Sequence, residues 1–182
     1  MEIIFRNPKE YVDILQLTEF LGKQSLGYVG YDDWVEKVKF QLDTGSKKAV
    51  IAYSEDKIVG DILYQPHRTL DRVREVKNIR VHPDMRWRDF ARFMHRQVEF
   101  LESHEYDYLM ADAPADNKGV CFFLEGVGYV PVFTVPLYED NSLDIVYVKP
   151  KDPKTAPESD ILVVNTIKEY ALDKALYRKK DF

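Results

Sequence analysis

One segment constrains the fold of this chain more than any other. Residues 73–82 alternate apolar and polar side chains as a strand does, and a proline-containing loop then leads directly into an amphipathic helix predicted over residues 85–103. The loop carries two arginines, Arg86 and Arg88. Backbone N–H groups at a helix start lack partners inside the helix and lie at the positive end of its dipole. The order strand, tight loop, helix therefore predicts a local binding site for an anion such as a pyrophosphate.

The remaining periodicities predict a mixed α/β domain in which strands and helices do not alternate strictly. Further strands are predicted at residues 2–6, 49–53, 58–65, 106–111, 129–138 and 143–148. Further helices are predicted from Asn7 to Gly22, from Asp32 to Gly45, over 117–125 and over 161–178. Asn7 is the predicted N-cap of the first of these helices, with Pro8 as its first residue.

The length of 182 residues fits one domain, predicted at residues 1–150, followed by an appendage at 151–182. Residues 149–160 contain three of the nine prolines among lysines and acidic residues, which predicts an extended linker before the C-terminal helix. That helix covers a sheet edge, docks on a second copy of the chain or on a partner protein, or begins a second domain.

Composition narrows the classes of partner and compartment. The formal charge of −5 disfavours nucleic-acid binding, because such proteins usually carry a basic face. With Cys121 as the one cysteine, no intrachain disulfide can form, which favours the reducing cytoplasm. Since neither a signal peptide nor an apolar run long enough to cross a bilayer is visible, we expect a protein that is neither secreted nor membrane-embedded.

The loop and helix start resemble the GNAT superfamily of acyl-CoA-dependent N-acyltransferases. Its pattern is V-x-P at a strand end, followed by [QR]-x-x-G-x-[GA]; here Val81-His82-Pro83 precedes Arg86-Trp87-Arg88-Asp89-Phe90-Ala91. Asp89 stands where the pattern has glycine, and it adds a carboxylate and a Cβ at the place where phosphate should approach.

A second resemblance lies downstream, where the family often shows N-x-x-A-x-x-F-Y-x-x-x-G-[FY]. The corresponding segment runs from Asn117 to Tyr129, and Asn117, Phe123, Gly128 and Tyr129 match. Leu124 replaces the tyrosine that protonates the departing CoA thiolate in many relatives.

The resemblance implies a GNAT fold: a mixed, mostly antiparallel central sheet of about seven strands flanked by helices. It implies acetyl-CoA as the cosubstrate, with no metal, and pantetheine bound along a strand at residues 79–81 that splays from its neighbour near 108–111. The residues that it assigns to acyl-CoA are Ile79, Val81, Arg86, Trp87, Arg88, Asp89, Phe90, Ala91, Asn117 and Phe123.

Candidate catalytic residues follow from the same resemblance. Glu75 lies where several relatives have a carboxylate that deprotonates the amine; the alternative is a solvated strand glutamate paired with Lys77 or Arg74. Tyr129, Tyr138 and Tyr147 are candidates for the general acid that Leu124 does not supply, although a tyrosine can equally serve the core.

Three other features have open interpretations. His82, His95 and His104 are dispersed, and their spacing matches no known metal motif, so we expect surface or helix-flanking histidines. Cys121 is either a covalent acyl carrier or a small core residue. The segment 27–31 either lines the acceptor cleft or is a packed connector.

Two functions are compatible with these features. The first is an N-acetyltransferase that passes an acetyl group from acetyl-CoA to a primary amine of a small-molecule or protein acceptor by direct attack. The second is a catalytically impaired GNAT-fold module that docks a protein partner, with Asp89 and Leu124 marking lost catalysis.

Overall fold

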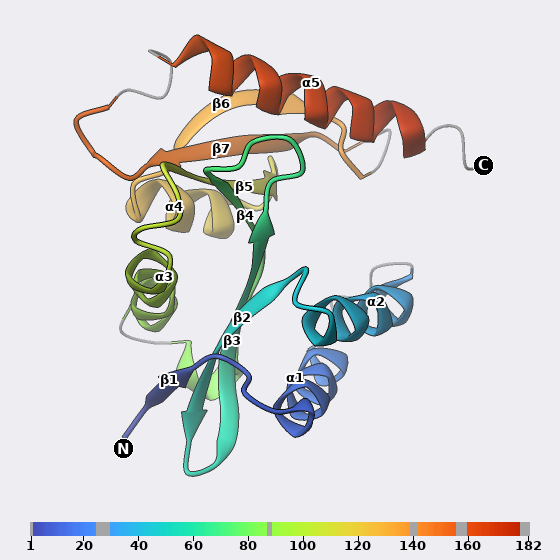
Figure 1. The fold of residues 1–182 in the computed structure, drawn as a ribbon, viewed down its shortest axis with the longest axis vertical. Helices are drawn as coiled ribbons and strands as arrows, with labels where there is room; N and C mark the ends of the chain where they lie inside the picture. The colour runs from blue at the N-terminus through green and yellow to red at the C-terminus, as the bar shows by residue number, and fades with distance from the viewer. Residues whose placement is uncertain (1, 25–29, 87–88, 139–141, 156–159, 179–182) are drawn as a thin grey trace. The chain divides into compact units, whose positions relative to one another are not determined.

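A computed structural model describes residues 2–24, 30–86, 89–138, 142–155 and 160–178. Within these ranges the chain forms seven strands, five α-helices and one 3-10 turn (Figure 1). Their bounds are β1 (Ile4–Arg6), α1 (Tyr11–Lys23), α2 (Tyr31–Asp43), β2 (Lys48–Ser54), β3 (Lys57–Pro66), β4 (Val73–Val81), η1 (Pro83–Met85), α3 (Phe90–Leu101), β5 (Tyr108–Pro114), α4 (Lys118–Gly126), β6 (Val130–Val135), β7 (Asp144–Pro150) and α5 (Ile161–Arg178).

Hydrogen-bonded neighbours in the sheet follow the order β1-β2-β3-β4-β5-β7-β6. The pairs β1–β2, β2–β3, β5–β7 and β6–β7 are antiparallel, and β4–β5 is parallel. The predicted mixed, mostly antiparallel sheet flanked by helices is therefore confirmed. The chain divides into two compact units: unit 1 holds residues 1–65 and 76–104, and unit 2 holds residues 66–75 and 105–182.

In unit 1, α1 and α2 cover one face of β2 and β3, and α3 covers the other (Figure 1). Alternate residues of β2 point to opposite faces, as the pleat of a strand requires. Ala49, Ile51 and Tyr53 join the core beneath α1 and α2, where Leu17 and Val38 are fully buried. The buried residues of the two helices therefore share one core with β2.

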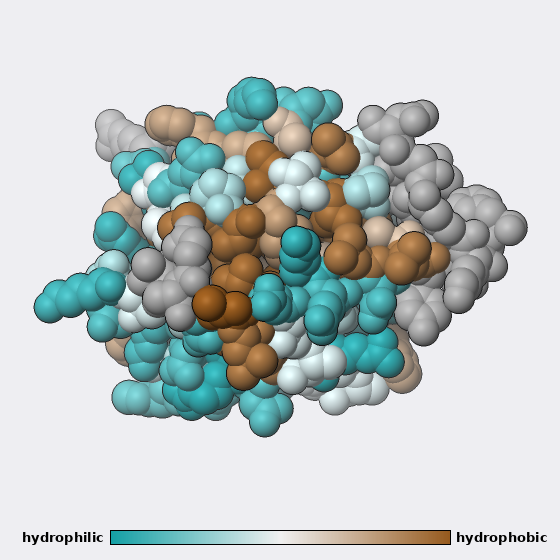
Figure 2. Space-filling model, turned by 90° about the horizontal axis from the view of Figure 1, so that it is seen from above, coloured by the Kyte–Doolittle hydropathy of each residue, from teal (hydrophilic) through white to brown (hydrophobic). Residues whose placement is uncertain are grey.

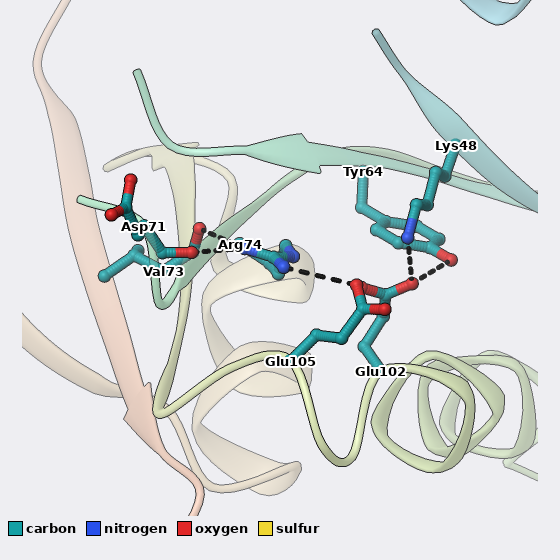
Figure 3. A network of polar contacts seen from close by, with 7 residues as sticks. All are labelled: Lys48, Tyr64, Asp71, Val73, Arg74, Glu102 and Glu105. Atoms are coloured by element: carbon teal, nitrogen blue, oxygen red, sulfur yellow. Dashed lines mark hydrogen bonds and ion pairs between the residues drawn. The ribbon is translucent and has the colours of Figure 1, made fainter. Parts of the chain in front are cut away.

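A charged pair fixes the end of α3 to the sheet of unit 1. Lys48 of β2 donates a hydrogen bond to Glu102 at 2.8 Å, and Tyr64 of β3 donates to the same carboxylate oxygen at 3.2 Å (Figure 3). Glu102 is buried, so these two donors offset the cost of removing its charge from water.

In unit 2, α4 and α5 pack on opposite faces of the sheet formed by β5, β6 and β7. Val146 and Val148 of β7 face the apolar cluster that contains Ile167 and Ala171 of α5. Tyr147, between them, faces α4, where its hydroxyl donates to Glu125 at 3.4 Å. The predicted C-terminal helix thus forms and contributes to the core of unit 2.

Arg74 ties the start of β4 to the loop before β5 within unit 2. Its guanidinium donates to the Asp71 carbonyl at 2.7 Å and to Glu105 at 3.4 Å (Figure 3). The side chain is buried, so these acceptors compensate its desolvation.

Apolar side chains also remain at the surface. The face drawn in Figure 2 shows brown apolar groups among teal hydrophilic ones. On α5 the exposed large apolar residues are Ile161, Leu162, Leu172 and Leu176. None of the helices that the structure describes is long and apolar enough to cross a membrane.

Two predicted helix starts are wrong. The first helix begins at Tyr11 with Glu10 as N-cap, because Asp13 accepts hydrogen bonds from the backbone N–H groups of Lys9 and Glu10. The third helix begins at Phe90 instead of Met85, because Pro83 starts a separate 3-10 turn. The strands predicted at residues 49–53 and 58–65 form an antiparallel hairpin of β2 and β3, with Glu55 and Asp56 at positive φ in its turn.

Candidate active site

The segment between β4 and α3 is the one for which the sequence predicts an anion-binding turn. After Val81, the His82 imidazole accepts a hydrogen bond from the Asp84 N–H at 3.3 Å, and η1 follows at once. Arg86, which is exposed, donates from Nε to the Val81 carbonyl at 3.3 Å. The chain then enters α3 at Phe90. A strand end, a basic side chain and a helix start therefore lie within one short segment.

Asp89, at the entry to α3, has a left-handed backbone conformation with φ 57° and ψ 20°. This conformation favours glycine, and aspartate is among the residues that tolerate it best. The position where the resembled pattern has glycine therefore keeps a glycine-like backbone here. The Asp89 carboxylate lies 3.3 Å from Nε of Arg92, so a neighbouring cation partly offsets its charge.

The first turn of α3 contains backbone N–H groups that no carbonyl within the helix accepts. Among the described residues no side chain caps this helix. The N–H groups of its first turn precede the first intrahelical bond, which Phe93 makes to the Asp89 carbonyl at 3.0 Å. Such donors, together with the helix dipole, suit a phosphate oxygen.

The other residues assigned to acyl-CoA have mixed surroundings. Ile79 and Ala91 are half-buried, and Phe90 is buried against Phe5, with 6.1 Å between ring centroids. Trp87 and Arg88 lie outside the described residues. In unit 2, Asn117 caps α4 by accepting from the Val120 N–H at 3.3 Å, so this side chain has a structural role.

A buried polar cluster in unit 1 was missed by sequence reasoning. It joins Tyr31 at the start of α2, Asp61 of β3, and Asn78 and Arg80 of β4. Asn78 donates to Asp61 Oδ2 at 2.7 Å, and the Asp61 side chain is 0% exposed. Burial raises the pKa of Asp61 to about 7, even though Asn78 and Arg80 both favour its charged form. The available signal was an aspartate inside an otherwise apolar predicted strand.

In unit 2, Tyr138 is the centre of a second polar group. Its hydroxyl donates to Asp112 at 2.8 Å and accepts from the Lys174 ammonium at 2.9 Å, which also lies 4.2 Å from the centre of the Tyr138 ring. The residue as a whole is 49% exposed, and its hydroxyl lies between Asp112 and Lys174. Desolvation, followed by Asp112 and the more distant Asp144 and Glu75, raises the pKa of Tyr138 well above its usual value.

Glu75 is almost fully buried, at 1% exposure, so the interpretation as a solvated strand glutamate is wrong. It pairs in register with Met110 of β5. Because register partners on neighbouring strands share a sheet face, Glu75 points to the side of the sheet that α5 covers. Its electrostatic effect on Tyr138 places the predicted base and one predicted acid in the same part of unit 2.

The remaining candidates lie on the α4 side of unit 2. Tyr129 is buried directly after α4, and its N–H donates to the Leu124 carbonyl at 3.0 Å. Burial raises the pKa of Tyr147, whose hydroxyl contacts Glu125. Cys121 is buried, with its thiol 3.6 Å from the Pro114 carbonyl, as expected of a small core residue.

The histidines differ from the expectation in one case. His82 flanks η1 and His104 is exposed, but His95 on α3 is 1% exposed and therefore belongs to the interior of unit 1. Within the described parts of the chain, no three His, Cys, Asp or Glu side chains group together as a metal site would require.

Comparisons with known proteins agree with this geometry at the level of the fold. No protein-family model matches the sequence, and the comparison with curated proteins finds no match. Among solved structures, a protein from Desulfovibrio desulfuricans assigned to the GNAT acetyltransferases aligns with a TM-score of 0.70 and 16% identity, over 82% of this chain and 99% of that one.

Two further solved structures contain coenzyme A or its acetyl ester. The NatC complex bound to Gag peptide and CoA aligns with a TM-score of 0.63 and 14% identity, over 82% of this chain and 99% of that chain. A Bacillus anthracis protein assigned as a streptothricin acetyltransferase, in complex with acetyl coenzyme A, aligns with a TM-score of 0.52 and 17% identity. The alignment covers 59% of this chain and 64% of that chain. This chain therefore has the fold of the GNAT-family acetyltransferases.

Proposed function

We propose that this protein is an acyltransferase that moves an acetyl group from acetyl-CoA to a primary amine of a small-molecule or protein acceptor. The observation that carries the proposal is the start of α3: a helix without a side-chain cap, entered through a glycine-like Asp89 and preceded by Arg86. Local donors of this kind can hold a pyrophosphate although the chain as a whole is acidic, with a formal net charge of −5.

In the proposed reaction the amine nitrogen attacks the thioester carbonyl carbon. A C–N bond forms, the C–S bond breaks, the surplus ammonium proton passes to a carboxylate, and the thiolate takes a proton from a general acid. Backbone N–H groups along the end of β4 would stabilise the oxyanion.

Tyr138 is the proposed general acid that supports this chemistry best. Its raised pKa keeps the phenol protonated at neutral pH, and a thiolate has a conjugate-acid pKa of about 8.5. Glu75 is the proposed base, and its burial beside the apolar cluster below α5 keeps bulk water from it. Tyr129 remains a second candidate acid.

Isothermal titration with acetyl-CoA tests the proposal. We expect binding in the micromolar range, and Arg86→Ala should weaken it by about tenfold, the usual effect of losing one charge-assisted hydrogen bond. Arg96→Ala removes an exposed arginine later in α3 and serves as the matched control.

The titration also separates the two functions. If no heat is detected at millimolar acetyl-CoA, the acyltransferase proposal fails and the GNAT-fold docking module becomes the better description. Equal affinities of the Arg86→Ala and Arg96→Ala variants would instead mean that the anion is bound elsewhere.

A further inference from the structure

The buried polar cluster of unit 1 contains more hydrogen-bonding capacity than it uses. Asn78 satisfies Oδ2 of Asp61 at 2.7 Å. Tyr31 donates its hydroxyl to the Leu21 carbonyl at 2.9 Å and also interacts with the Arg80 guanidinium. Arg80 also donates a long hydrogen bond, at 3.4 Å, from Nη1 to the carbonyl of Ile79.

Two atoms of this cluster are buried without a hydrogen-bond partner among the described residues: Oδ1 of Asp61 and Nε of Arg80. Buried polar atoms nearly always have partners, because leaving them desolvated and unpaired is costly. One atom is an acceptor and the other a donor, and they belong to side chains that interact electrostatically. Arg80 is half-buried, so the cluster reaches towards the surface at that side chain.

The two unsatisfied atoms are complementary to a ligand group that has a donor next to an acceptor. A primary ammonium supplies the donor for Asp61, and a carbonyl oxygen three bonds away from that nitrogen supplies the acceptor for Arg80. An α-amino group beside its own carbonyl has this arrangement, whereas the terminal amine of a lysine side chain does not.

We propose that Asp61 and Arg80 bind the acceptor of the acyl transfer, and that this acceptor is an α-amine with an adjacent carbonyl, as in an amino-acid amide or a peptide N-terminus. The inference rests on the proposed function and specifies its substrate class. Asn78 acts as a positioning residue that holds Asp61 in place.

The pKa values of the possible acceptor amines also favour an α-amine. An α-ammonium has a pKa of about 8 and a lysine ammonium of about 10.4. The pKa of Asp61, raised by burial to about 7, is close to the first and about three units below the second. Before it attacks, the bound ammonium must lose a proton, and passing this proton to Asp61 is about 250-fold more favourable from an α-amine than from lysine, because the two ammonium pKa values differ by about 2.4 units. Glu75 remains the proposed base for the proton released after the attack. Among the described residues, the charged and polar groups that the structure places around Asp61 are Arg80, Tyr31 and Asn78.

Equilibrium binding to the full chain, in the presence of saturating CoA, tests this inference without requiring turnover. The probes are glycinamide and isobutylamine, which have the same number and branching of non-hydrogen atoms, but isobutylamine lacks the carboxamide. By calorimetry at pH 7.5 we expect glycinamide to bind at least about tenfold more tightly, the value of one additional charge-assisted hydrogen bond. Asp61→Asn should weaken the binding of both probes, and Arg80→Met should remove the preference for glycinamide over isobutylamine. Asp33→Asn, on the exposed first turn of α2, is the control.

Because the preference is a ratio measured on one folded sample, partial loss of folding in a variant does not change it. Equal affinity of the two probes, absence of binding by both, or an Asp61→Asn variant that binds like the wild type would each overturn the inference. Glycinamide can also be titrated without CoA, so a failure of acetyl-CoA binding, which overturns the proposed function, is distinguished from a failure of the acceptor site.

Discussion

At the scale of single residues, Asp89 differs from the glycine of the resembled family pattern in its side chain but has the backbone conformation that favours glycine. Its φ of 57° is the conformation for which glycine is usually selected. The substitution therefore leaves the turn intact and changes its electrostatics, since a carboxylate lies at the start of a helix that we propose to bind phosphate.

Three substitutions separate the backbone and charge effects of Asp89. Asp89→Asn and Asp89→Gly both remove the charge in residues that tolerate positive φ, so both should tighten acetyl-CoA binding. Asp89→Ala also removes the charge but should lower the free energy of unfolding by about 1 kcal/mol relative to Asp89→Gly, because alanine is strained at this φ. Calorimetric titration and denaturant unfolding measure the two quantities. Unchanged or weaker binding by Asp89→Gly would mean that the turn meets its ligand differently from the resembled family.

At the scale of secondary-structure elements, α5 is more than an appendage. The sequence predicted residues 151–182 as a linker and helix outside a domain of residues 1–150, and this boundary remains a proposal. Ile167, Ala171 and Ala175 of α5 are nevertheless buried in the same cluster as Val146 and Val148 of β7. The helix therefore contributes to the packing of unit 2.

Ile167→Ala should show this contribution directly. The residue is 0% exposed, and truncating a buried isoleucine costs about 2–5 kcal/mol of stability. Leu162→Ala, at an exposed position of the same helix, should change stability by less than about 0.5 kcal/mol. Thermal and denaturant unfolding compare the two variants. An Ile167→Ala variant that unfolds like the wild type would show that α5 is an independent tail.

At the scale of the whole molecule, the buried Asp61 couples folding to pH. In the folded chain its carboxyl retains a proton up to about pH 7, whereas in the unfolded chain it loses it near 3.8. Between these values the folded state binds more protons, so the stability contributed by this group falls as pH rises from about 4 to 7.

The full effect of a shift of about three pKa units is about 4 kcal/mol, which sets an upper limit for one group. The slope of unfolding free energy against pH should therefore be less negative in Asp61→Asn than in the wild type. Denaturant unfolding between pH 4 and pH 8 provides the comparison. If the two slopes are the same, Asp61 is not held protonated by burial.

The oligomeric state also belongs to this scale. A homodimer or a partner contact through the C-terminal region remains a prediction, and the exposed apolar residues of α5, such as Leu162 and Leu176, are the surface on which it depends.

The sequence by itself determined the fold class, because the order of elements and the strand–loop–helix segment before Phe90 are local patterns of period, proline and charge. It also predicts where an anion would bind, since a site at a helix start is built from consecutive residues. It could not place the helix starts at Glu10 and Phe90, which depend on the Asp13 side chain and on a separate turn at Pro83.

Only the tertiary structure decided which polar side chains lie together and how burial changes their pKa values. Asp61 and Arg80 come from different strands, and Tyr138 meets Lys174 across 36 residues of sequence, so no spacing predicts either group. Burial, which raises the pKa of Asp61 and removes Glu75 from solvent, is a property of the packed chain. Secondary structure and local turns depend on neighbouring residues in the sequence. The pKa of a side chain depends instead on the burial and the charged or hydrogen-bonding groups that folding places next to it.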